Sequence, residues 1–143
     1  MKHRIPALFL LVAVAAFGCK PMEYYQPPPS ADSARTAATV VGSRTDLLGP
    51  VKGIEAWIAR VDDKAAPVRS YDQSYTIAPG RHRIVISAQV GTETATAPVD
   101  YTFEAGKSYV VRGTDIRSGS SEVWLEDART GRTVGGKFRA TVK

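Results

Sequence analysis

The sequence has few of the residues that bind metal ions or act as catalytic bases. Among 143 residues there is one cysteine, Cys19, and there are two histidines, His3 and His82. A zinc or copper site needs several imidazole or thiolate ligands, so we expect neither a metal nor a cofactor. A Ser-His-Asp triad would need His82 as its base, and no nucleophile-elbow motif accompanies it. We therefore expect a protein that is not an enzyme and a half-buried, hydrogen-bonded His82; a hydrolase with an unusual site around His82 is the alternative.

Adjacent carboxylates occur twice, at Asp62-Asp63 and at Glu126-Asp127. Acid-base catalysis of the glycosidase type needs two carboxylates that face one substrate across a cleft. These pairs instead lie in or beside expected turns, where aspartates commonly accept hydrogen bonds from backbone amides. The oxygen spacing of a calcium loop is also missing. The sequence therefore predicts backbone capping at both pairs.

The N-terminal segment differs in composition from the rest of the chain. Lys2 and Arg4 precede an uncharged, largely apolar run over residues 5–18, which is the layout of a secretory signal peptide. The run is shorter than the roughly 20 residues that a membrane-spanning helix needs. We expect residues 1–18 to be a helical signal segment that is removed, and the loss of its two charged residues lowers the formal charge from +5 by two. At this modest charge, and outside the cytoplasm, we expect no nucleic-acid partner.

The cysteine directly follows this segment. The motif "AFGC" at residues 16–19 resembles the lipobox of bacterial lipoprotein precursors. This resemblance implies that a signal peptidase cuts before Cys19 and that acyl chains on Cys19 anchor the protein to a membrane of the bacterial cell envelope. Lys20, where some lipoproteins carry aspartate, implies sorting to the outer membrane, with the domain facing the periplasm. The alternative is cleavage after residues 13–15, which would release a soluble protein with a free thiol.

Residues 19–36 have the composition of a linker, and residues 37–143 that of a single domain. Prolines at positions 27–29 favour extended polyproline geometry, and small polar residues follow them. Tyr24 and Tyr25 lie inside this linker. The sequence leaves open whether they rest at a lipid interface or pack on the domain.

The domain shows strand periodicity throughout. Residues 81–90 alternate most clearly between apolar and polar side chains. Pro79-Gly80 fits a type II turn, and Gly106 and Gly131 stand where a positive φ closes a hairpin. The segment "GTETATAP" at residues 91–98 reads as a mobile loop. About seven to eight short strands at this spacing predict an all-β fold, a single antiparallel β-sandwich, with a small barrel as the alternative.

Part of this pattern resembles a known group of domains. "VDDK" at residues 61–64, "YTIAPGRHRIVISAQV" at 75–90 and "FEAGKSYVVR" at 103–112 resemble PEGA-type repeats and related transthyretin-like sandwiches of bacterial envelope proteins. Those domains carry a strand, a Pro-Gly turn and a strand that packs back on the first. The resemblance implies a non-enzymatic sandwich of the cell envelope.

Two features indicate where such a domain would bind a partner. Trp124 alternates with Val123 and Leu125, so we expect it on the outer face of its strand. There it would either anchor an interaction or cover the second face of a sandwich or a gap under the linker. Four basic residues would form one basic surface if their strands are neighbours; they are Arg81, Arg83, Lys137 and Arg139. If the strands are not neighbours, these charges would protect a solvated sheet edge against aggregation. We expect a membrane-anchored structural or protein-binding module whose partner is an envelope protein or a cell-wall polymer. An inhibitor of an envelope-targeting hydrolase is a further alternative.

Overall fold

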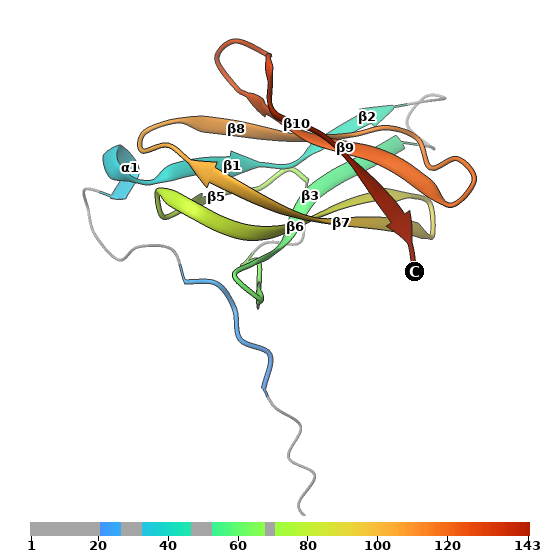
Figure 1. Ribbon diagram of the computed structural model, residues 1–143, viewed down its shortest axis with the longest axis horizontal. Helices are drawn as coiled ribbons and strands as arrows, with labels where there is room; N and C mark the ends of the chain where they lie inside the picture. The colour runs from blue at the N-terminus through green and yellow to red at the C-terminus, as the bar shows by residue number, and fades with distance from the viewer. Residues whose placement is uncertain (1–20, 27–32, 47–52, 68–70) are drawn as a thin grey trace, which may run out of the picture.

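The computed structural model describes residues 21–26, 33–46, 53–67 and 71–143 (Figure 1). The signal segment, the lipobox with Cys19, and the proline tract all lie outside these residues. Within them the chain is almost entirely β-strand, and α1 is a single helical turn. The elements are α1 (Ser33–Thr36), β1 (Ala38–Val41), β2 (Ser43–Asp46), β3 (Gly53–Val61), β4 (Lys64–Ala65), β5 (Ser74–Ile77), β6 (Gly80–Val90), β7 (Glu93–Phe103), β8 (Ser108–Gly113), β9 (Ser120–Asp127) and β10 (Thr133–Val142).

The ten strands form one curled sheet, open like a half-barrel. Their order is β2-β3-β6-β7-β10-β9-β8-β1-β5, and β4 pairs with β3 beside this path. The all-β prediction is confirmed. The finer expectation of a fully antiparallel fold is wrong, because β1 and β8 run parallel, with Val40 opposite Tyr109. Two separate sheets are not confirmed either, since hydrogen-bonded pairing continues from one end of the path to the other.

Two segments join the halves of this sheet. Half A contains β2, β3, β4, β6 and β7, and half B contains β1, β5, β8, β9 and β10. The chain passes from β1 to β2 through Gly42, where an added Cβ would lie 2.6 Å from the carbonyl oxygen of Ala56. At the other corner β10 pairs along β9 but reaches β7 only through Thr141 and Val142. The sheet therefore turns a corner between β7 and β10, and the chain crosses between the halves at Gly42, so that half A folds against half B.

The core lies between the two halves. Small side chains let the halves approach closely, since a Cβ added to Gly113 of β8 would lie 3.1 Å from the Cβ of Ala88 of β6. One end of the core is filled by aromatic rings with neighbouring centroids 4.9–6.3 Å apart. These rings belong to Tyr25, His82, Tyr101, Phe103 and Tyr109.

The segment read as a loop at residues 91–98 is mostly strand, which corrects the sequence prediction. β7 begins at Glu93, and its inward side chains Ala95 and Ala97 are buried. Alanine alternating with threonine carries little hydrophobic contrast, so the period of two is weak in this segment. Pro98 is tolerated because it lies opposite Val85 of β6, beyond the point where β10 pairs with β7.

Part of the expected linker is attached to the domain. The amide of Tyr25 donates to the carbonyl of Ala65 at 2.7 Å, and the amide of Ala65 donates to the carbonyl of Glu23 at 2.9 Å. Tyr25 is 8% exposed and its hydroxyl accepts a hydrogen bond from the amide of Ala78 at 2.8 Å, whereas Tyr24 points outward and is 49% exposed. Of the two alternatives left open by the sequence, Tyr25 packs on the domain.

Candidate binding surface

The outer face of β8, β9 and β10 gathers charged side chains around one tryptophan. On β9 the side chains of Val123 and Leu125 are buried, so the residues between and beside them point outward. In the strand pairing, Trp124 lies opposite Arg112 on one side and Lys137 on the other. We call this surface the Trp124 face; it consists of Arg112, Glu122, Trp124, Glu126, Lys137 and Arg139.

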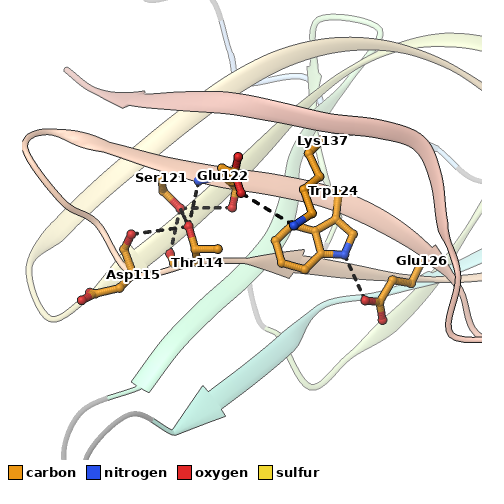
Figure 2. Close-up of polar contacts among 7 residues, drawn as sticks. All are labelled: Thr114, Asp115, Ser121, Glu122, Trp124, Glu126 and Lys137. Atoms are coloured by element: carbon orange, nitrogen blue, oxygen red, sulfur yellow. Dashed lines mark hydrogen bonds and ion pairs between the residues drawn. The ribbon is translucent and has the colours of Figure 1, made fainter.

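Trp124 is held in place by two neighbours (Figure 2). Its indole Nε1 donates to Oε1 of Glu126 at 3.0 Å. The Nζ of Lys137 stands 4.6 Å from the ring centroid, in cation–π contact. The expectation that Trp124 lies on the outer face is confirmed, and the ring is half-buried with a fixed orientation.

Glu126 is the acceptor that organises one end of this face. Its second carboxylate oxygen accepts from Nε of Arg112 at 2.9 Å. Partial burial opposes the ionisation of Glu126, but the hydrogen bonds from Trp124 and Arg112 outweigh it and hold the pKa of Glu126 below its ordinary value. Glu126 is therefore a carboxylate at neutral pH, and its charge fixes both donors.

At the other end of the face a second carboxylate of β9, Glu122, lies beside cations of β10. Lys137 stands 3.7 Å from a carboxylate oxygen of Glu122, and Arg139 lies opposite Glu122 in the β9–β10 register. Cations on β8 and β10 thus flank β9, where Glu122 and Glu126 lie on either side of Trp124. The face presents both signs of charge in a fixed pattern, as complementary protein surfaces do.

An open groove of about 540 Å³, lined by charged and hydroxylated residues, adjoins the Trp124 face. Glu122 and Arg139 line it, so the groove and the face share two side chains. Arg117, whose side chain is 86% exposed, stands at its edge 3.8 Å from a carboxylate oxygen of Asp115. The remaining lining residues are small and hydroxylated; they are Thr114, Ser120 and Ser121.

Hydrogen bonds hold the wall of the groove to β9 (Figure 2). Ser121 Oγ donates to the carbonyl of Thr114 at 2.8 Å, and the amide of Glu122 donates to Thr114 Oγ1 at 2.9 Å. The Ser121 hydroxyl is thus committed to a backbone carbonyl, with no histidine among its hydrogen-bond partners. The groove is equipped to bind by charge and hydrogen bonding, and no activated nucleophile is present among its described lining residues.

The structure does not bring the four predicted basic residues together. Lys137 and Arg139 lie on β10 in half B, whereas Arg81 and Arg83 lie on β6 in half A, with β7 between. Arg81 pairs with Asp100 of β7 at 3.1 Å, and both side chains are exposed. The condition for one continuous basic surface, neighbouring strands, is therefore not met.

His82 has the environment that the sequence predicted. Its side chain is 12% exposed, and its Nδ1 stands 2.6 Å from Oδ2 of Asp62. Its Nε2 stands 2.9 Å from the carbonyl oxygen of Ala78. Because both ring nitrogens are engaged with oxygens, His82 ties the turn at Asp62 to the turn before β6.

One carboxylate of each adjacent pair caps backbone groups, as expected, whereas Glu126 of the second pair accepts from side chains instead. Asp62 accepts from the amide of Arg83 at 3.1 Å. Asp127 accepts from the amides of Thr130 and Arg129 at 2.9 and 3.0 Å, and these bonds lower the pKa of Asp127. Among the described residues no cluster of three or more histidine, cysteine or carboxylate side chains could hold a metal ion. In the same part of the chain, no helix has the length and apolarity to cross a membrane.

Some residues of the surface were not identified from the sequence. Arg112 follows the buried Val111, so strand alternation placed it outward, but nothing in the sequence linked it to Glu126 on another strand. Arg117 lies in a short turn with no periodic pattern, so no local signal indicates that it lines the same groove as Arg139.

Comparisons with known proteins give no match: no family model fits the sequence, and neither a curated protein nor a solved structure is significantly similar to it.

Proposed function

We propose that this chain is a lipoprotein anchored in the bacterial cell envelope and that its β domain is a non-enzymatic, structural or protein-binding module. The observation that carries the proposal is the Trp124 face, where an aromatic ring and charges of both signs are fixed beside an open groove. Tryptophan and arginine dominate the binding energy of protein interfaces. Side chains that are already ordered lose less conformational entropy when a partner binds.

An envelope protein is the favoured partner of this surface. The alternating pattern on Glu122, Trp124 and Glu126, bordered by cations, calls for a partner with its own charges of both signs. A neutral polysaccharide would leave much of this pattern unpaired, which is unfavourable when the groups are desolvated. A cell-wall polymer is therefore an alternative outcome of the test below.

The proposed anchor rests on the sequence pattern at residues 16–19, which resembles a lipobox. The proposed outer-membrane location rests on Lys20. Membership of the PEGA-like or transthyretin-like sandwiches is likewise a proposal. Two observations support it: the Pro79-Gly80 turn leads into β6 as the resemblance implies, with Gly80 at φ 117°, and the two halves of the sheet enclose a common core.

Acylation is tested by growing cells with labelled fatty acid. The full chain should carry the label, and the Cys19→Ala variant should lose it completely. Label that persists in Cys19→Ala would remove the anchor from the proposal.

Partner binding is tested by site-specific photocrosslinking in intact cells. A photoreactive residue at position 139, inside the groove, should form an adduct with the same envelope protein in repeated experiments. The same residue at position 81 is the matched control, because Arg81 is also exposed on an outer strand face but belongs to half A. Equal adducts from both positions, or none from position 139, would contradict a binding role for the Trp124 face. An adduct that disappears on digestion of the cell wall would identify the polymer instead.

A further inference from the structure

The outer face of half A has an apolar groove where the N-terminal segment meets β3. Its volume is about 320 Å³, and its lining residues are Met22, Trp57, Ala59, Arg60 and Ala65. Three large apolar or aromatic side chains in the described part of the chain are strongly exposed, and two of them, Met22 at 59% and Tyr24 at 49%, lie in this one short segment. Apolar exposure is therefore concentrated beside the groove.

These side chains occupy fixed positions on the domain. The backbone hydrogen bonds between residues 23–25 and Ala65 hold the segment against β4, and the buried Tyr25 ring secures it. Strand-like alternation then turns Tyr24 outward while Tyr25 points inward. Met22 and Tyr24 are consequently part of the domain surface: Met22 lines the groove with Trp57, and Tyr24 lies in the same segment and pairs with Ala65, another residue of the groove lining.

Covalent geometry places the proposed anchor near this surface. Met22 lies three positions after Cys19, and three steps of fully extended chain span at most about 11 Å. If Cys19 is acylated, the bilayer surface lies within that distance of Met22. A fully free linker of residues 19–36 would have allowed a much larger separation.

We propose that Met22, Tyr24 and Trp57 contact the lipid bilayer and so orient the anchored domain; the inference rests on the proposed acylation of Cys19. Tryptophan and tyrosine favour the interface between headgroups and acyl chains, where the ring is apolar and its polar atom stays hydrated. The acyl chains supply the affinity and this surface supplies the orientation.

The charges around the groove indicate that the contact is apolar and not electrostatic. Arg60 and Lys64 stand near Glu23 and Asp63, with Lys64 paired to Glu23 at 3.9 Å. Because opposite charges nearly balance, the contact should not depend on the fraction of anionic lipid.

This orientation points the Trp124 face away from the membrane. Trp57 and Trp124 lie on the outer faces of opposite halves of the sheet, and residues 21–26, blue in Figure 1, lie on the side of β6 away from β8 and β9. A partner of the Trp124 face would therefore approach from the aqueous side.

The experiment compares the two tryptophans in one membrane. The full chain, purified with its acyl groups from a bacterial host, is reconstituted into phosphatidylcholine vesicles whose acyl chains are brominated near the headgroup. In the Trp124→Phe variant, emission from Trp57 should fall about twofold, because an interfacial indole meets the quencher. In the Trp57→Phe variant, emission from Trp124 should not change. Adding anionic lipid should alter neither result.

Flotation of the vesicles separates the two proposals. If the chain floats with the vesicles but Trp57 is not quenched, or both tryptophans are quenched equally, the orientation is overturned while the anchor stands. If the chain that retains Cys19 behaves like the Cys19→Ser variant and does not float, the anchor and the orientation both fail. A Met22→Ser, Tyr24→Ser double variant, altered only at exposed positions, should still float and should show weaker quenching of Trp57.

Discussion

Trp57 and Trp124 occupy equivalent positions on opposite halves of the sheet, yet their surroundings differ. Both are half-buried and alternate with buried side chains on a central strand. Trp124 lies between two cations and donates to a carboxylate. Trp57 of β3 lies opposite Ser87 of β6, and Ser87 lies opposite Thr96 of β7. The cross-strand neighbours of Trp57 in half A are therefore uncharged. Strand alternation sends a side chain outward, but the neighbouring strands determine what that side chain can bind.

The largest expected effect concerns the N-terminal segment on the Trp57 side. Tyr25→Ala removes a buried ring and should lower the free energy of unfolding by about 3 kcal/mol. Tyr24→Ala, one residue away but exposed, should change it by less than about 0.5 kcal/mol. Urea denaturation of both variants in a Cys19→Ser background measures the difference. Similar values for the two variants would show that the segment is not fixed to the domain.

The next effect tests whether Glu126 fixes Trp124. Glu126→Gln keeps the shape but removes the charge that accepts from Trp124 and Arg112, and should destabilise the fold by about 1 kcal/mol. Glu122→Gln is the matched control, because the Glu122 side chain is 59% exposed and has one distant ion-pair partner. Equal destabilisation by the two changes would contradict the special role of Glu126.

A smaller effect should appear with pH and only on the Trp124 face. The pKa of Glu126 lies below its ordinary value of 4.5, so its stabilisation is complete above that pH and is lost as pH falls through the lowered pKa. Emission from Trp124 in Trp57→Phe should shift in that acid range, while emission from Trp57 in Trp124→Phe should not. A transition centred above 4.5, or one shared by both variants, would argue against this assignment.

The smallest effect concerns the cation over the ring. Lys137→Gln should cost about 0.5 kcal/mol through loss of the cation–π contact, and Lys137→Arg should restore most of it. Equilibrium unfolding at low salt resolves such a difference in a set of matched variants. Loss of stability in Lys137→Arg as large as in Lys137→Gln would indicate that packing of the lysine stem matters more than its charge.

Local features of this fold could be predicted from the sequence, whereas the pairing of distant strands could not. The alternation over residues 81–90 predicted β6 and the outward direction of Arg81. The glycines at positions 80, 106 and 131 predicted the turns. The outward position of Trp124 and the engaged His82 follow from the same local periodicity. The parallel pairing of β1 with β8 has no local signature, since it joins residues far apart in the sequence, such as Val40 and Tyr109.

The candidate site shows the same division. Glu122, Trp124 and Glu126 share one strand, so their common face was predictable. Arg112 and Lys137 join them only through the order β8-β9-β10, and Arg81 is excluded by that same order. Tyr25 was unpredictable for a related reason: its proline-rich neighbourhood indicates a linker, and its partners Ala65 and Ala78 are distant in sequence.

The passage of the chain through Gly42 has a consequence for how the protein unfolds. Because β1 belongs to half B and β2 to half A, one continuous segment has to leave both halves together. Ser43, just after the turn, donates its hydroxyl to the carbonyl of Val111, 68 residues away. This segment supplies β1 to half B and β2 to half A, so each half lacks one of its strands without it. The two halves therefore form one cooperative unit, and its folding requires distant contacts early, which places it among the slow-folding β topologies.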